Sequence, residues 1–240
     1  MNWFDDYEIR ARILPAIIVF LPVVIPVFLI VYGEMTSIVS FLFSGIVFAA
    51  LVYPLSFIIR KCGSNYENDL WEGWDGAPST RILRWRDDTF SVPVKTQLHE
   101  AVRSYCGITL SGTEDERIDP READEKIIDA FSQVKHFVYH NDPNGTWKKF
   151  NAEYGFNRNL LGCKYLWVVL SAVGVVICGI CWYFTEDNAY AVGVFIDAAM
   201  LITAVILTRY ILPETVKDPA EYYASSVWQS FLVIVKRNRV

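Results

Sequence analysis

Several signatures that would indicate chemistry are missing from this sequence. Only three histidines occur among its 240 residues, and their spacing predicts no Ser-His-Asp or Cys-His arrangement. No glycine-rich loop has the spacing of a phosphate-binding motif. The formal charge of -5, with no concentrated basic face, argues against a nucleic-acid partner. These absences predict that the protein is not an enzyme and has no cofactor.

Cysteine and histidine spacings also exclude two kinds of structural site. The five cysteines lack the spacing of a disulfide framework and are expected to be reduced thiols that pack as small apolar groups. His136 and His140 are four residues apart, but no zincin glutamate or third ligand accompanies them. We therefore expect two exposed histidines at a helix end and no metal site.

Apolar residues, in contrast, make up 53% of the chain and gather into four long blocks. Blocks of about 18 to 24 residues match a hydrocarbon core of roughly 30 Å. We predict an all-α integral membrane protein in which four transmembrane helices form two hairpins that flank a helical cytoplasmic domain. The spans are expected over about residues 13–31, 38–59, 165–184 and 189–212.

The blocks divide the chain into four expected regions. The first block is too long for a signal peptide and lacks a cleavage site, so it is expected to remain as a span. The regions are residues 1–61 with the first hairpin, 62–164 as the cytoplasmic helical domain, 165–212 with the second hairpin, and 213–240 as a cytoplasmic amphipathic helix.

The first span contains three prolines, Pro15, Pro22 and Pro26. Each proline removes one backbone donor, so the helix should bend while neighbouring helices or water meet the freed carbonyl groups. The prolines indicate either a tolerated kink or a hinge.

Basic residues predict the orientation. All 22 Lys and Arg lie before the first span, between spans two and three, or from Arg209 onward, and neither hairpin tip has one. By the positive-inside rule, both termini and the central domain are expected to be cytoplasmic.

The central domain has local helix signals. Pro93 and Gly107 bracket one amphipathic helix, and Asp119 with Pro120 begins a better-marked second one. The segment 111–117 between them is expected to be a solvated loop. Pro213 is expected to end the fourth helix, and the last helix then lies along the inner leaflet or packs on the central domain.

Asp197 is the first candidate functional residue, because a carboxylate inside a span costs at least about 2.5 kcal/mol. It is either a hydrogen-bonded acid in a tight bundle or a carboxylate that lines a pore or relays protons in an oligomer. Small and polar residues form helical stripes that suit close packing. The stripes are Tyr190, Gly193, Asp197, Ala204 and Thr208; Ser171, Gly174, Cys178 and Cys181; and Ser37, Ser40 and Ser44.

A cationic and aromatic cluster is the second candidate. Guanidinium groups beside amides and aromatic planes suit phosphate-bearing or purine ligands, such as a small nucleotide. Juxtamembrane Arg and Trp also anchor at headgroups without any ligand. The candidate ligand-binding or partner-binding residues are Trp71, Trp74, Arg81, Arg84, Arg86, Asn151, Tyr154 and Arg158.

Three segments together resemble a family of bacterial integral membrane proteins of unassigned function. That family has a W-G-G-x-P-T-x-R-x-L-R segment, a D-P-x-x-A-D helix and a Y-G-F-x-R-N-L segment. The matching segments here are 70–84, 119–124 and 154–160, and Asp75 stands where the family pattern has glycine. The resemblance implies a bacterial membrane protein that forms one coherent unit, and it implies no catalytic activity.

The plan of a cytoplasmic domain joined to a helix bundle favours a membrane effector or channel-like protein. Its domain would sense a cytoplasmic protein or small ligand, and the spans of several copies would rearrange to depolarise the membrane, as in small phage-defence effectors. The alternatives are a non-conducting anchor that docks a soluble partner and a small transporter. The lipid bilayer and further copies of the chain are the other expected partners.

Overall fold

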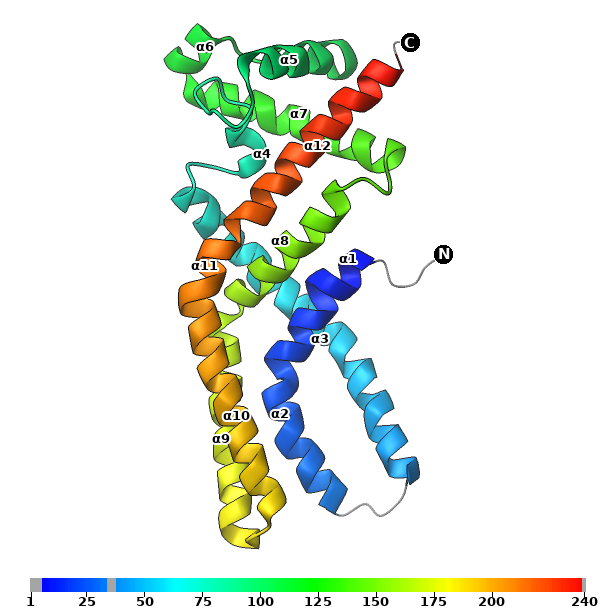
Figure 1. Ribbon diagram of the computed structural model, residues 1–240, viewed down its shortest axis with the longest axis vertical. Coiled ribbons are helices and arrows are strands. Elements are labelled where there is room, and N and C mark those ends of the chain that lie inside the picture. Colours follow the sequence, from blue (N-terminus) through cyan, green and yellow to red (C-terminus); the bar gives the residue numbers. More distant parts are fainter. Residues whose placement is uncertain (1–5, 34–37, 239–240) are drawn as a thin grey trace. The chain divides into compact units, whose positions relative to one another are not determined.

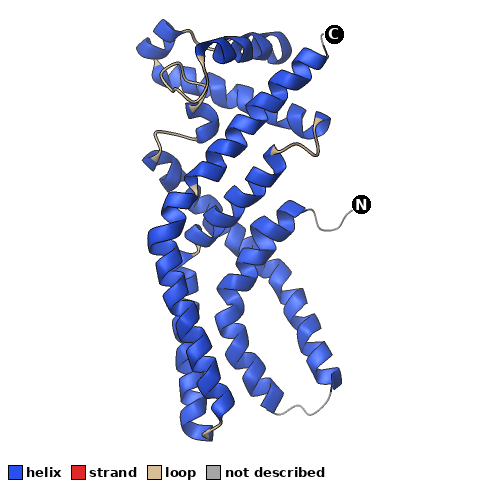
Figure 2. Cartoon of the chain, in the orientation of Figure 1, coloured by secondary structure: helices blue, strands red, loops and turns tan. Residues whose placement is uncertain are grey.

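The computed structural model describes residues 6–33 and 38–238, and it describes side chains over residues 7–31 and 50–238. Within those ranges the secondary structure is helical without any strand (Figure 2), which confirms the all-α prediction. The long helices are α2 (Leu14–Gly33), α3 (Ile38–Gly73), α5 (Val92–Cys106), α7 (Pro120–Asn141), α8 (Trp147–Gly162), α9 (Lys164–Thr185), α10 (Asn188–Ile206) and α12 (Lys217–Arg237). The short ones are α1 (Asp6–Glu8), α4 (Pro78–Arg81), α6 (Thr113–Ile118), α11 (Leu212–Thr215) and the π-helical η1 (Ile9–Ile13) and η2 (Leu207–Ile211).

Three helical stretches of the described residues are long and apolar enough to cross a membrane, which supports a membrane protein. They are Ile9–Val31, Lys164–Thr185 and Asn188–Arg237. The expected span 38–59 lies within α3, while the turn 34–37 and the side chains of residues 32–49 lie outside the described part of the chain. The four-span count and the topology therefore stay predictions.

The chain divides into two compact units, each made of two segments. The membrane unit comprises Met1–Glu67 and Ala152–Val216, and the polar unit comprises Asn68–Asn151 and Lys217–Val240. This division differs from the expected one, because both ends of the region 62–164 join the membrane unit and α12 joins the polar unit. Contacts that are distant in sequence, described below, cause the difference.

In the membrane unit, α2, α9 and α10 pack against one another (Figure 1). Glu186 adopts a left-handed conformation at the end of α9, with φ of 56°. Asp187 then begins α10 by accepting a hydrogen bond from the Ala189 amide at 2.9 Å. Many side chains that point away from these contacts are large and apolar, as Phe195 at 75% exposure illustrates, and this surface suits lipid.

The start of α2 shows how a freed carbonyl group finds a donor. Pro15 cannot donate to the Ala11 carbonyl oxygen four residues earlier. The fully buried Asn159 of α8 replaces the missing donor, since its Nδ2 lies 2.6 Å from that oxygen. A neighbouring helix thus meets the carbonyl freed by this proline, as the sequence predicts.

Helices α3 and α8 approach each other closely through glycine. A Cβ atom on Gly162 would lie 2.6 Å from the Gly63 Cα atom, and one on Gly63 would collide with Asn159. Two side-chain contacts strengthen this approach: Glu67 accepts from the Tyr154 hydroxyl at 2.7 Å and from Arg158 at 2.8 Å. These contacts explain why residues 62–67 and 152–164 belong to the membrane unit.

Helix α3 continues as far as Gly73, beyond the residues 38–59 that are expected to span the membrane. One helix end differs from the sequence prediction, because Pro213 does not end the fourth helix. The π-helical segment η2 precedes it, and Pro213 lies in the first turn of α11, where a missing N–H is tolerated.

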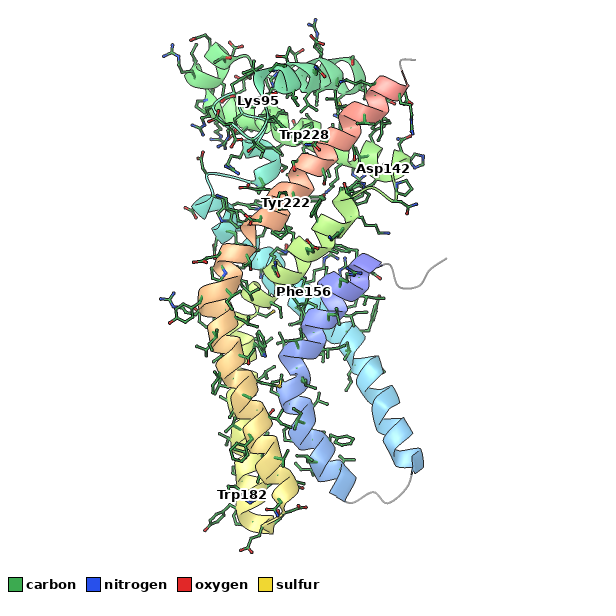
Figure 3. The ribbon with its side chains drawn as sticks, viewed as in Figure 1. Lys95, Asp142, Phe156, Trp182, Tyr222 and Trp228 are labelled. Atoms are coloured by element: carbon green, nitrogen blue, oxygen red, sulfur yellow. The ribbon has the colours of Figure 1, made fainter. Side chains whose placement is uncertain are left out.

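The polar unit has its own core, formed by the apolar faces of α5, α7 and α12. Trp228 of α12, labelled in Figure 3, and Phe231 of the same helix are fully buried in it. The Trp228 indole donates to the Ser79 carbonyl oxygen at 3.0 Å. Of the two alternatives for the last helix, packing on the central domain is therefore the observed one.

Local signals in the polar unit give mixed results. Asp119 accepts a hydrogen bond from the Glu122 amide at 3.0 Å and caps α7, as predicted. Gly107 ends α5 with φ of 69°, which is a conformation that glycine adopts at low cost. The prediction of a loop over 111–117 is wrong, because α6 forms there. Glu116 of this helix is buried, and its Oε2 atom accepts a hydrogen bond from the Trp85 amide at 2.9 Å.

Candidate functional site

Asp197 lies at the centre of the three-helix packing in the membrane unit. It is fully buried. Within the described part of the chain, its Oδ2 atom receives one weak contact, from the Cys178 thiol at 3.7 Å, and its Oδ1 atom has no hydrogen-bond partner. A buried carboxylate with so little compensation is costly in an apolar setting.

A second oxygen without its usual donor faces the same place. Pro26 has no N–H, so the carbonyl group of Pro22 lacks the donor that an uninterrupted helix would provide. A Cβ atom on Gly174 would collide with this carbonyl oxygen and would lie 2.6 Å from Asp197 Oδ2. The bare backbone of Gly174 therefore lets both oxygens approach the same edge of α9.

The small-residue stripes supply the close packing around Asp197. Gly193 admits Cys178 and Leu29, because a Cβ atom there would lie 2.8 Å and 2.9 Å from their side-chain atoms. Ser171 is fully buried three residues before Gly174, and its hydroxyl has no hydrogen-bond partner. In the third stripe, Ser37 lies outside the described residues, as do the side chains of Ser40 and Ser44.

The arrangement joins oxygen acceptors without matching donors. Helices α2 and α10, and α9 beyond its first residue, contain no Lys or Arg. Among the described residues no group of three His, Cys, Asp or Glu could hold a metal ion, so a divalent site with several carboxylates does not fit. The chemistry that such a set of oxygens favours is binding of a proton or a monovalent cation.

Arg84, in the polar unit, is already neutralised within its own chain. Its guanidinium group donates to Asp124 at 2.7 and 2.8 Å and to Asp75 at 2.8 Å, and Arg84 is only 5% exposed. Asp75 stands where the family resemblance leads to an expected glycine. It adopts φ of 61°, a left-handed conformation that aspartate tolerates, and its carboxylate gains both Arg84 and Arg86 as partners.

The other members of the cationic cluster in this unit also have acidic partners. Arg81 pairs with Asp87 at 3.1 Å and with Glu221. Trp71 accepts backbone hydrogen bonds from Trp74 and Gly76 at the end of α3, and both tryptophans are partly buried. An anionic ligand would therefore have to displace carboxylates that the arginines already contact.

Tyr154 and Arg158, which are candidate ligand-binding residues together with Asn151, belong to the membrane unit, whereas Asn151 belongs to the polar unit. Arg158 lies over the Tyr154 ring at 5.4 Å, and both contact Glu67. Burial alone would lower the pKa of the Arg158 guanidinium, but the Glu67 charge and hydrogen bond raise it overall. The contacts give this pair a structural partner in place of a ligand.

Sequence reasoning missed Lys95, which is 1% exposed (Figure 3). Its ammonium group donates to the carbonyl oxygens of Arg84 at 2.6 Å, Trp85 at 3.3 Å and Asp87, so it holds together the segment that follows α4. Burial lowers the pKa of Lys95. Burial, and then the Lys95 charge, lower the pKa of His99 to about 4.

His136 and His140 are both exposed on α7, which confirms the exposure predicted for these two histidines.

No family model, curated protein or solved structure matches the chain. The family resemblance stated above thus stays a prediction, and the function must be argued from the site alone.

Proposed function

We propose that the chain is a multi-pass effector or channel-like protein of the bacterial inner membrane. Four spans cross the membrane, both termini and the polar unit are cytoplasmic, and several copies assemble. A cytoplasmic protein or small ligand acts on the polar unit, and the membrane units then rearrange to permeabilise the membrane. Depolarisation of this kind suits a role in phage defence.

The observation that carries the proposal is the uncompensated carboxylate of Asp197. A fully buried acid with one free oxygen destabilises the packed arrangement of α2, α9 and α10. A rearrangement of the helices that exposes this acid to water would recover part of the free energy lost on its burial. The free-energy difference between the packed bundle and a hydrated arrangement is therefore reduced. A helix bundle with two accessible arrangements is the physical requirement for gating.

A second candidate, a non-conducting membrane anchor, is favoured by a different observation. The three arginines of the predicted ligand cluster in the polar unit, Arg81, Arg84 and Arg86, already have carboxylate partners, which weakens their case as a receptor for an anionic ligand. Apolar side chains such as Ile118, at 75% exposure, would instead suit docking of a soluble protein.

Induced expression in cells loaded with a membrane-potential dye tests the two candidates. The effector should depolarise the membrane, and Asp197→Asn should change the extent of depolarisation without loss of expression. An anchor should leave the potential of expressing cells equal to that of cells with an empty vector. If Asp197→Asn depolarises cells to the same extent as the wild type, Asp197 has no role in conduction.

Assembly provides an independent test. The proposal expects particles that contain several copies in mild detergent and in nanodiscs, because one chain cannot line a water path and also keep Asp197 away from lipid. A strictly monomeric particle in both media would contradict the effector function.

A further inference from the structure

We propose that the membrane unit holds a binding site for a monovalent cation, H⁺ or Na⁺, between the Asp197 carboxylate and the Pro22 carbonyl oxygen. The inference deepens the proposed function, on which it rests for its biological role: cation occupancy would set which arrangement of the bundle is stable.

The charge balance of the site is the first argument. Asp197 presents two oxygens; among residues 7–31 and 50–238, whose side chains are described, Oδ1 meets no partner and Oδ2 meets only a thiol, at 3.7 Å. A thiol is a weak donor and cannot compensate a buried carboxylate. A bound positive charge would satisfy these oxygens without any change in the fold.

The helix backbone supplies the second argument. Pro26 frees the carbonyl group of Pro22 at the point where Gly174 lets α2 and α9 come together beside Asp197. At Pro15, by contrast, Asn159 supplies the missing donor to the Ala11 carbonyl oxygen. At Pro22, the described residues instead bring an acid, Asp197, to the same edge of Gly174 as the freed carbonyl group. A proton on Asp197 would turn the acid into that donor, and Na⁺ would bridge the two oxygens.

Few other titratable groups would influence the site. Helix α9 brings Cys178, with Cys181 one turn further on, and α10 brings Tyr190 at its outer end. Residues 14–31 of α2 contain no titratable side chain. Asp197 is therefore the group whose charge a bound cation balances.

The experiment measures thermal unfolding of the full chain in nanodiscs, with NaCl replaced by choline chloride at constant ionic strength and over a range of pH. If Na⁺ binds, the Tm of the wild type rises with NaCl at a fixed pH. If H⁺ binds, the packed state takes up a proton more tightly than the unfolded chain, so the Tm falls as the pH rises and does not respond to Na⁺. Asp197→Asn should remove the Na⁺ response, or the fall of the Tm with rising pH, because the amide is neutral and donates to the Pro22 carbonyl itself; the opposite contribution of His99 is the same in both proteins.

A second variant tests the carbonyl ligand while it keeps the acid. Pro26→Ala restores an N–H donor to the Pro22 carbonyl and should weaken apparent Na⁺ affinity about tenfold, or shift the midpoint by about one pH unit. Pro54→Ala in α3 is the matched control and should leave both responses as in the wild type. Equal responses in the wild type and Asp197→Asn, or in the wild type and Pro26→Ala, would overturn the site.

The failure of the site and the failure of the effector function give different results. Cation-linked stability in a protein that never depolarises cells would keep the site and remove the effector function. If the protein depolarises cells but its Tm changes with neither Na⁺ nor pH, the effector function stands and the cation site is removed.

Discussion

The two units of this protein treat buried charge in opposite ways. In the polar unit, Arg84 has two carboxylate partners and Lys95 has three backbone carbonyl partners. In the membrane unit, Asp197 is more deeply buried than Arg84, and the hydrogen-bonding contact that the described residues give it is a thiol. Compensated charges stabilise a single arrangement, whereas an uncompensated one leaves a free-energy cost that a ligand or a rearrangement can remove.

The largest expected effect comes from removing compensation in the polar unit. Arg84→Ala leaves Asp124 without its bidentate partner and should lower the free energy of unfolding by about 3 kcal/mol, the scale for breaking a buried pair. Chemical unfolding in mild detergent, followed by tryptophan fluorescence, measures the change.

Arg117→Ala is the control for Arg84→Ala. Arg117 pairs with Glu114 at 3.1 Å, but both side chains are more than 70% exposed, so its loss should cost less than about 0.5 kcal/mol. If both substitutions lower the free energy of unfolding by the same amount, burial of the ion pair does not determine its contribution to stability.

Next in size is a steric change at the membrane site. Gly174→Ala places a methyl group against the Pro22 carbonyl and the Asp197 carboxylate and should cost about 2 kcal/mol, the range for overpacking. Gly179→Ala, on the same helix, meets no atom within 4 Å and should be neutral or slightly stabilising. Resistance of the purified variants to thermal unfolding in nanodiscs checks the difference, which a loosely packed bundle would not show.

A smaller effect is expected where the membrane unit does compensate a freed group. Asn159→Ala removes the donor to the Ala11 carbonyl and should cost about 1.5 kcal/mol, as for a lost buried hydrogen bond. In a Pro15→Ala background the restored N–H can serve that carbonyl, so the same substitution should cost less. A double-mutant cycle measures this coupling, and strictly additive effects would show that Asn159 does not substitute for the missing donor.

The smallest effect concerns pH in the polar unit. The pKa of His99 is about 4 in the folded protein against an ordinary value of 6.5. The unfolded chain therefore binds a proton that the folded chain does not, and stability should fall by about 1 kcal/mol, after allowance for solvent screening, as pH drops from 6.5 to 4. Stability titrations of His99→Gln should lose this slope, whereas exposed His136→Gln should keep it.

Several helix boundaries were predictable because their causes are local. Asp119 and Pro120 form a start signal within two residues, and Gly107 supplies a left-handed end. Helix α6 also has a local start, where Asp115 accepts from the Gly112 amide, but the burial of Glu116 against the amide of Trp85, 31 residues away, is a tertiary contact that the sequence does not reveal. Pro213 is a stop signal in the sequence, although in the structure it lies in the first turn of α11, directly after a π-helical segment.

The candidate ligand cluster illustrates the limit of spacing arguments. Arg84 and Arg81 look available in the sequence, since their partners Asp124 and Glu221 are 40 and 140 residues away. Only the packing of α4 against α7 and α12 brings these acids to the guanidinium groups. The arginines then stabilise the polar unit, and their availability to a ligand is reduced.

The sequence by itself determined that the protein is helical and that it contains spans suited to a membrane, because hydrophobic block length and helix propensity are local properties. It also marked Asp197, since an acid among apolar residues is unusual wherever the chain folds. The tertiary structure alone decided that Pro22 lies beside Gly174 and Asp197 while Asn159 lies beside Ala11. Contacts between distant residues depend on how helices pack, and no local pattern specifies which freed carbonyl receives a donor and which faces an acid.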